Sequence, residues 1–410
     1  MVTAKRPQGV VPKLRFPGFV GEWRWAPLSR LASRSSLRNS DVQEKLVLTN
    51  SAEQGILDQR DYFEKDIADK ENLQSYYVVK KGDYVYNPRI SSTAPVGPIS
   101  KNEIGTGVMS PLYTVFRFHS ANDAFFAHFF KSSRWYGYLR TNSSTGARHD
   151  RMSIGTDVFM QMPVPDITPA EQQKIADCLS SLDACIGAEA RKLDALKAHK
   201  QGLMQQLFPV EGQHLPRLRF PGFEGEWEEV TLSAQVELIS GQHLAPDAYA
   251  DEGEIPYFTG PSDYSNDLAS VGKWTSRSAN TGRSGDTLIA VKGSVGELLH
   301  LALEEVAMGR QLMAVRPRKV DGRFLFQFLG TRRGRLSDLA SGNLIPGLSR
   351  GDILGIKINI PSRSEQETIA DCLSFLDDLI ATQSRKIATL QQHKKGLMQG
   401  LFPAVVAYAA

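Results

Sequence analysis

Two stretches of this sequence combine positively charged side chains with amide and hydroxyl groups, a combination that suits nucleic-acid recognition. The first runs from Lys131 to Arg151, has Asp150 as its only acidic residue, and interleaves aromatic residues with its cations. The second runs from Arg323 to Arg350. Arginine can bridge guanine through two hydrogen bonds, asparagine and glutamine can bridge adenine, and serine and lysine suit phosphates. The same composition also fits a solvated helix face over core aromatics, so these stretches alone leave both interpretations open.

The sequence shows no catalytic or metal-binding motif. Cys178, Cys185 and Cys372 are not at the spacing of metal ligands. No GxxxxGKS/T phosphate loop, GxSxG elbow or HExxH helix is present. The NPR tripeptide at Asn87 lacks the aromatic residue that would stack on an extruded base, so it is a poor candidate for methylation chemistry. Together these absences indicate a chain that recognises a partner and does not itself carry out a reaction.

Composition and charge are those of an ordinary globular protein. A length of 410 residues predicts several domains, and a net charge of +3 gives only a weak preference for an anionic partner. The first residues, MVTAKRPQGV, lack the apolar segment of a secretory signal. No apolar run approaches the roughly 18 residues that a membrane span needs. We therefore expect a cytoplasmic protein that does not associate with membranes.

Three sequence blocks occur twice, in the same order, and divide the chain into two copies of one module. LRFPGFVGEW begins at Leu14, and LRFPGFEGEW begins at Leu218. EQQKIADCLSSLDACI from Glu171 returns as EQETIADCLSFLDDLI from Glu365. LKAHKQGLMQQLFP and LQQHKKGLMQGLFP then close the two copies. Because the repeat is so long, it indicates a duplicated module and not a solenoid.

The segments between these blocks, residues 24–165 and 228–361, share little more than a skeleton. Gly82-Asp83 and Gly285-Asp286 each precede a strand pattern, which a turn rich in glycine and serine follows. An apolar strand, a Ser/Gly loop and a last strand that ends in proline come next in both copies. A conserved frame with diverged loops is expected of two copies that do the same job on two different targets.

Each copy ends in a long helix with a narrow apolar stripe, over residues 171–207 and 365–401. The apolar residues recur at alternating steps of four and three, the 3.5-residue period of a coiled coil. Polar residues interrupt the stripes at Glu189 and Lys200 and at Gln383 and Lys394. We expect the two stripes to pack on each other with the helices antiparallel; the alternative is that each helix packs on its own domain. The aromatic LRFPGF blocks should dock each variable segment on the helices.

The paired blocks resemble the specificity subunits of type I restriction–modification systems. The resemblance rests on the LRFPGFxGEW, EQxxIADCLSxLD and HKxGLMQxLFP pairs and on the Gly-Asp skeleton, and it spans residues 12–403. It implies an α+β fold with two β-rich globular target-recognition domains, separated by two long antiparallel coiled-coil helices, in a pseudo-two-fold internal repeat. The recognition domains would occupy residues 12–170 and 216–362, and the spacer helices 171–209 and 364–403.

The resemblance further implies a DNA sequence-specificity subunit with no catalytic activity and no cofactor of its own. Each domain would read one half of a bipartite, asymmetric target in double-stranded DNA, and the coiled coil would set the spacing. The partners would be two methyltransferase subunits, which use S-adenosylmethionine to methylate adenine, and restriction (motor–nuclease) subunits, which use ATP and Mg²⁺. Exposed residues near Glu189, Lys192 and Lys200 are one candidate face for these partners.

The loops that follow the shared skeleton supply the candidate DNA-binding residues. Recognition residues vary within this family, so we choose them by their place in the skeleton and by their chemistry. In the first copy they are Tyr86, Asn87, Arg89, Ser91, Ser92, Thr93, Asn142, Ser143, Ser144, Arg148 and Arg151. In the second copy they are Lys292, Ser294, Arg310, Gln311, Asn343 and Arg350. No catalytic residue and no metal ligand is predicted.

Two other functions stay open on the sequence alone. The chain could be a coiled-coil adaptor that links two protein partners, or a DNA methyltransferase or nuclease that acts by itself. The missing nucleotide and methyl-donor motifs argue against the second. Methyl transfer by the purified chain would favour the second function, and association without any effect of DNA would favour the adaptor.

Overall fold

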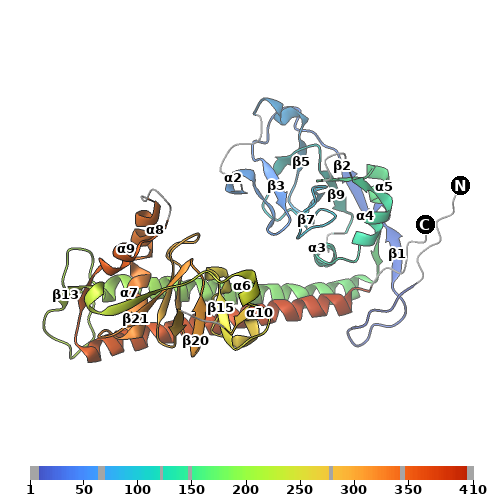
Figure 1. The fold of residues 1–410 in the computed structure, drawn as a ribbon. Helices are drawn as coiled ribbons and strands as arrows, with labels where there is room; N and C mark the ends of the chain where they lie inside the picture. Colours follow the sequence, from blue (N-terminus) through green and yellow to red (C-terminus); the bar gives the residue numbers. More distant parts are fainter. Residues whose placement is uncertain are drawn as a thin grey trace. The chain divides into compact units, whose positions relative to one another are not determined.

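The computed structural model describes residues 9–62, 70–120, 123–145, 150–276, 280–341 and 347–403. The chain divides into two compact units (Figure 1). The first unit combines Met1–Ala188 with Ile387–Ala410, and the second unit is Glu189–Lys386. This division differs from the four successive segments predicted from the sequence, because each unit takes one end of both long helices. No helix in the described ranges has the length and apolar character of a membrane span.

The first unit is built around a four-stranded antiparallel sheet with the order β2-β9-β6-β7. These strands are β2 (Ala32–Ser35), β6 (Tyr84–Tyr86), β7 (Ile99–Lys101) and β9 (Thr114–Phe118). Separate strand pairs are β1 (Arg24–Pro27) with β12 (Pro163–Asp166), β3 (Leu48–Ser51) with β4 (Gly55–Asp58), β5 (Tyr77–Val79) with β8 (Gly107–Met109), and β10 (Ser144–Thr145) with β11 (Met152–Ser153). The short helices are α1 (Leu28–Leu31), α2 (Gln59–Tyr62), α3 (Ala124–Phe130), α4 (Tyr136–Asn142) and α5 (Thr156–Met160).

The second unit repeats this frame. Its sheet has the order β14-β21-β18-β19, with β14 (Val236–Ser240), β18 (Thr287–Ala290), β19 (Leu298–His300) and β21 (Leu312–Pro317). The strand β13 (Glu228–Thr231) pairs with β22 (Lys357–Ile360), as β1 pairs with β12. A second four-stranded sheet holds β15 (Ile255–Phe258), β16 (Trp274–Thr275), β17 (Thr281–Arg283) and β20 (Glu305–Met308). The helices are α7 (Gly322–Thr331), α8 (Arg333–Ser341) and α9 (Arg350–Leu354).

The repeated Gly-Asp pair explains why the frame is shared. Gly82 and Gly285 adopt φ angles of +90° and +89°, which glycine reaches without the steric cost of a Cβ. The aspartate that follows each glycine is buried. Asp83 accepts hydrogen bonds from the Lys80 amide (2.7 Å) and from Nε of Arg117 on β9 (2.6 Å). Asp286 makes the matching contacts with Arg283 and Arg316. The pair therefore closes a turn and links it to the central strand in each unit, which makes β6 equivalent to β18 and β9 to β21.

The two predicted helices are α6 (Pro169–Leu207) and α10 (Arg363–Leu401), drawn green and red in Figure 1. In the first unit the start of α6 lies with the end of α10, because Ile175 and Leu179 share a core cluster with Leu401 and Phe402. In the second unit the end of α6 lies with the start of α10, where Leu207 packs in one cluster with Ile369 and Leu373. The pairing is therefore antiparallel, which confirms the expected arrangement of the two helices.

Both expected packing modes of the helices occur, at different places. One face of the helix ends is buried in the domain cores, so the alternative in which helices pack on globular domains holds at the ends. Between these ends the stripe positions Ile186, Leu193 and Leu196 of α6 and Ile387 and Leu390 of α10 are only half-buried, with exposed residues between them. This alternation is the burial pattern of a narrow coiled-coil seam.

The polar residues that interrupt the stripes contact the opposite helix. Nζ of Lys200 lies 2.6 and 2.7 Å from the carboxylate oxygens of Asp377, and Lys394 forms the equivalent ion pair with Asp183. The Gln383 amide donates to Oε2 of Glu189 at 2.6 Å. Glu189 and Lys200 are therefore engaged in the helix seam, and the candidate partner face among the exposed residues near them stays a prediction. Lys192 is exposed.

The LRFPGF blocks dock through a buried ion pair as well as through aromatic packing. Nε and Nη2 of Arg15 donate to the two carboxylate oxygens of Glu171, at 2.8 and 2.9 Å, in the first turn of α6. The indole of Trp23 donates to the same carboxylate at 3.1 Å. Arg219 repeats the arrangement with Glu365 in the first turn of α10, at 2.7 and 2.8 Å. Each block thus anchors its domain to the start of a long helix, as expected.

His128 differs in chemistry from Gln327, its counterpart beside the helices of the second unit. Nε2 of His128 lies 2.9 Å from Oγ of Ser180 on α6, and Asp183, Lys131 and Lys394 also face the ring. Burial, with smaller effects from Lys131 and Lys394, lowers the pKa of His128 to about 4. Between pH 4 and the unfolded pKa of about 6.5, the unfolded chain binds more protons at this residue than the folded chain does. The free energy of unfolding therefore falls as the pH falls.

Replacing His128 with glutamine should therefore reduce the acid sensitivity of the first unit. In the wild type this histidine makes the free energy of unfolding fall by about 3 kcal/mol as the pH drops from 6.5 to 4. Chemical denaturation at pH 7 and pH 4.5 measures the effect, with the exposed His119→Gln as the matched control. If the free energies of unfolding of wild type and His128→Gln differ by the same amount at both pH values, His128 does not cause the acid sensitivity.

Candidate nucleic-acid interface

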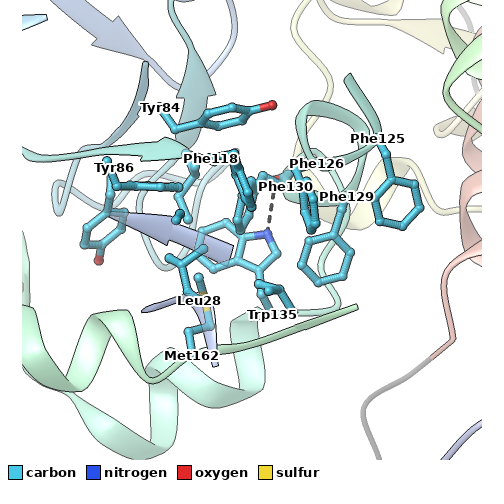
Figure 2. Packing of buried hydrophobic residues seen from close by; sticks show 14 of the residues in the cluster. Leu28, Tyr84, Tyr86, Phe118, Phe125, Phe126, Phe129, Phe130, Trp135 and Met162 are labelled. Atoms are coloured by element: carbon cyan, nitrogen blue, oxygen red, sulfur yellow. Dashed lines mark hydrogen bonds between the residues drawn. The ribbon is translucent and has the colours of Figure 1, made fainter. Parts of the chain in front are cut away.

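Most cationic side chains of the two basic stretches contact other residues of their own unit. In the first unit the Arg134 guanidinium donates to the Gln399 carbonyl at 2.6 Å, and the Trp135 indole, 1% exposed, donates to the Phe130 carbonyl at 3.1 Å (Figure 2). In the second unit Arg323 pairs with Asp371, Arg332 lies over the Phe328 ring, Arg333 pairs with Glu297, and Arg335 pairs with Glu211. These contacts within the unit favour, for the residues named, the structural interpretation over a direct role in DNA binding.

A cleft at one end of the first unit's central sheet gathers several of the predicted residues. It has a volume of about 460 Å³. Among the predicted residues, Asn87, Arg89, Ser91 and Arg151 line it. Asn50, Gln59, Leu112 and Tyr113 also line it and were not predicted. The cleft lies where β6 ends and β9 begins, so the frame of the sheet positions these loops.

Two guanidinium groups make this cleft suitable for DNA. Arg89 and Arg151 are held side by side by an antiparallel backbone bridge between them. The Arg89 side chain is exposed and forms no ion pair with the residues that the structure describes. Nε of Arg151 lies 3.7 Å from Asp150, in an exposed pair that contributes little. Both cations therefore remain available for phosphate oxygens or for the acceptors of guanine.

Asn87 acts as part of the scaffold beneath these cations. Its side-chain amide donates to the Asn50 carbonyl at 2.9 Å, and its oxygen accepts from the Arg89 amide at 3.0 Å. Asn50 is itself buried and donates to the Val85 carbonyl at 2.8 Å. These bonds join the loop after β6 to β3 and fix the backbone of Arg89. Asn87 itself is half-buried and lines the cleft, so its contact with DNA stays a prediction.

Tyr86 is a core residue, which corrects its place among the predicted DNA-binding residues. It is 1% exposed, its ring stacks on Phe159 at 4.8 Å, and its hydroxyl donates to the Val96 carbonyl at 2.9 Å. Figure 2 shows it in the apolar cluster of the first unit. Burial raises the pKa of its phenol well above the usual value. A side chain buried to this extent has almost no surface with which to contact DNA.

The remaining first-unit residues lie at different places. Ser92 and Thr93 are exposed in the turn after Ser91, whose hydroxyl accepts from the Ala94 amide at 3.1 Å. Asn142 and Ser143 close α4, because their side chains donate to the carbonyls of Tyr138 and Leu139. Ser144 is exposed on β10. Arg148 and, in the second unit, Asn343 lie outside the described residues. The Asn142–Ser144 group is not part of the cleft wall.

The second unit places its predicted residues on the equivalent loops. Lys292 and Ser294 are exposed in the turn after β18, and Arg310 and Gln311 are exposed just before β21. Arg350 is exposed at the start of α9, and its guanidinium donates to the Ser240 hydroxyl at 3.0 Å. The Ser349 hydroxyl accepts from the Asp352 amide and caps this helix, which fixes the position of Arg350. Cations and amides thus lie at the same end of both sheets.

A larger cleft in the first unit is a poorer match for DNA. It measures about 700 Å³ and is lined by carboxylates, including Glu53, Glu103 and Asp183, as well as by Lys101 and Lys131. Carboxylates repel phosphate, so its size does not make it the better candidate. No cluster of metal-ligating side chains exists among the residues with described positions.

These features define a class of protein: a duplicated frame on two paired long helices, with cationic and polar loops at the equivalent end of each central sheet. Residues 224–392 match the family model described as the type I restriction modification DNA specificity domain. A Methanocaldococcus jannaschii protein described as a type I restriction enzyme MjaX specificity subunit is 28% identical over 58% of this chain and 57% of its own. The MjaVIII specificity subunit from the same organism is 25% identical over 62% of this chain and 63% of its own.

Solved structures show the same fold. The type I restriction–modification S subunit from M. genitalium superposes with a TM-score of 0.62 at 14% identity, over 96% of this chain and 99% of that one. A chain from a structure of type I complex assembly and conformational transition gives 0.57 at 20% identity, over 95% and 97%. The predicted resemblance to type I specificity subunits and the predicted α+β fold with two β-rich domains and long paired helices are confirmed. The sequence match spans about three-fifths of the length of the first two relatives.

Proposed function

We propose that this chain is the DNA sequence-specificity subunit of a type I restriction–modification complex. One observation carries the proposal: both units present exposed cations and polar groups on equivalent loops, yet with different residues. Arg89 and Ser91 follow β6 where Lys292 and Ser294 follow β18, on frames that share the Gly-Asp turn. Two domains with the same frame and different loops suit the recognition of two different DNA segments. Together the two segments would make a bipartite, asymmetric target.

In this function the chain binds and positions, and its partners carry out the chemistry. Two methyltransferase subunits would supply adenine methylation with S-adenosylmethionine, and restriction subunits would supply ATP- and Mg²⁺-dependent cleavage. The chain itself would need no cofactor. The helix pair would set the distance between the two half-sites, because its length is determined by residue count and its ends are anchored in the two domains.

Exchanging one recognition segment tests the proposal. Residues 24–165 would be replaced by those of a relative, which exchanges the variable part of one frame and keeps the anchor of Arg15 and Trp23 on Glu171. The chimera and the wild type would be co-expressed with the neighbouring methyltransferase, and methylated adenines mapped across the genome. We expect one half of the methylated sequence to change and the other half to stay the same.

The reciprocal chimera, with residues 228–361 exchanged, is the matched control and should change the other half. A change of both halves by one chimera would contradict the model of two independent readers. Sequence-specific methylation by the chain without the methyltransferase would instead make it an enzyme. Association with the partner that leaves the methylated sequence independent of both segments would favour the adaptor function.

A further inference from the structure

The two units share one exposed turn that directly precedes the central strand. In the first unit the Tyr113 amide donates to the Ser110 carbonyl at 3.0 Å, and in the second the Leu312 amide donates to the Gly309 carbonyl at 2.9 Å. Each turn leads into the strand whose arginine contacts the buried aspartate of the Gly-Asp pair. The turns are therefore equivalent, and Leu112 of the first corresponds to Gln311 of the second.

Leu112 is an apolar side chain in a polar and cationic setting. Its side chain is 59% exposed, and it lines the cleft together with Arg89, Arg151 and Gln59. A single exposed leucine is common on protein surfaces and by itself indicates nothing. Here, however, it stands at a turn tip beside two guanidinium groups that can hold a DNA backbone, so a base edge would lie within its reach.

Gln311 occupies the corresponding tip with an amide. The side chain is exposed and forms no hydrogen bond with the residues that the structure describes, while its backbone carbonyl accepts from the Val291 amide at 2.8 Å. Its Oε1 lies 2.6 Å from the point where a Cβ on Gly260 would be. Glycine at that position therefore leaves room for the amide. Lys292 lies on the adjacent loop, in the position that Arg89 has in the first unit.

We propose that this turn tip is a specificity-determining position in each domain, with Leu112 contacting the C5 methyl group of a thymine and Gln311 contacting an adenine. The proposal rests on the proposed function. The thymine methyl is the one apolar group that the four unmodified bases present on their major-groove edges, and a glutamine amide can bridge N6 and N7 of adenine. The exchange of leucine for glutamine on an otherwise equal turn would then give the two half-sites different base requirements at one position.

Uracil substitution tests the first contact, because uracil differs from thymine only by the methyl group. Once the target is mapped, each thymine of the half-site that the first domain reads, on both strands, would be replaced in turn by uracil. Binding of these duplexes would be measured with the complex of the full chain and its methyltransferase. We expect one position at which uracil weakens binding about three- to five-fold in the wild type and has no effect in Leu112→Ala.

Ile104→Ala is the matched control, since Ile104 is 48% exposed in the same unit and does not line the cleft. This variant should keep the wild-type uracil penalty. A half-site without thymine, or a penalty that is the same in wild type and Leu112→Ala at every position, overturns the assignment of Leu112. Loss of sequence dependence in the wild-type complex itself would instead refute the proposed function.

Gln311→Leu tests the second contact by giving the second turn the residue of the first. We expect the preference for one adenine of the second half-site to fall about tenfold or more, with the first half-site unchanged. A methylation map identical to that of the wild type overturns the assignment of Gln311. A variant that no longer binds any duplex is distinguished by Gln311→Ala, which should keep phosphate contacts and lose only the discrimination at that position.

Discussion

Replacing Arg15 with alanine should lower the free energy of unfolding of the first unit by about 3–5 kcal/mol. The variant leaves Glu171, which is 3% exposed, without its bidentate partner, so that among the described residues only the Trp23 indole still bonds to the buried carboxylate. Removing one member of a buried ion pair is expensive because the remaining charge is desolvated and unpaired. Arg219→Ala should have the same effect in the second unit, where Glu365 is 1% exposed.

Two variants separate this cause from a general effect of losing an arginine. Arg24→Ala removes an exposed arginine from the neighbouring strand β1 and should change the free energy of unfolding by less than about 0.5 kcal/mol. Combining Arg15→Ala with Glu171→Gln removes the unpaired charge and should recover part of the loss. Thermal and denaturant unfolding measure both. A loss below about 1 kcal/mol for Arg15→Ala would show that the ion pair does not anchor the block.

Deleting one heptad from both long helices should shorten the unread spacer of the DNA target by about three base pairs. Removing residues 187–193 of α6 and 381–387 of α10 takes out Glu189 and Gln383 together. The partners of both cross-helix ion pairs, Lys200 with Asp377 and Lys394 with Asp183, remain. Seven residues correspond to about 10 Å of helix, and base pairs rise about 3.4 Å each. Both half-sites should stay the same.

The affinity should also fall, because three base pairs turn the second half-site by almost a third of a turn around the duplex, which repeats every 10–10.5 base pairs. Genome-wide mapping of methylated adenine gives the spacer directly. Deleting residues 187–193 alone is the control, since the two ion pairs can then no longer form in one register. An unchanged spacer in the double deletion would mean that the helices do not set the distance.

The fold was largely predictable because the features that determine it are local or repeated. The heptad stripes indicate the long helices and their pairing, and the placement of Lys200 and Lys394 in the stripes is explained by the aspartates opposite them. The turn glycines mark the start of β6 and β18. The ion pair of Arg15 with Glu171 was missed, since the residues are far apart in sequence and no local pattern connects them.

The site was predicted only in part, because exposure depends on tertiary packing. Tyr86 and Arg89 lie three residues apart, yet the first is in the core and the second is at the surface. Arg335 forms an ion pair with Glu211, which is more than a hundred residues away in the sequence, so its charge is not available to DNA. Leu112 was missed because it is apolar and carries no chemical signal of recognition. Aligning its turn with that of Gln311, through the shared Gly-Asp frame, would have indicated it.

The LRFPGF block of the first unit rests on the last helix of the chain: the Leu14 amide donates to the Gly400 carbonyl at 2.9 Å, and Phe402 packs on Phe125 and Phe129. A Cβ on Gly400 would lie 2.5 Å from the Leu14 side chain, so a larger residue there would displace the exposed end of this leucine. During translation the first unit therefore cannot complete its apolar core until the end of α10 has been synthesised. Early release of the growing polypeptide would leave part of that core exposed to aggregation and to chaperones.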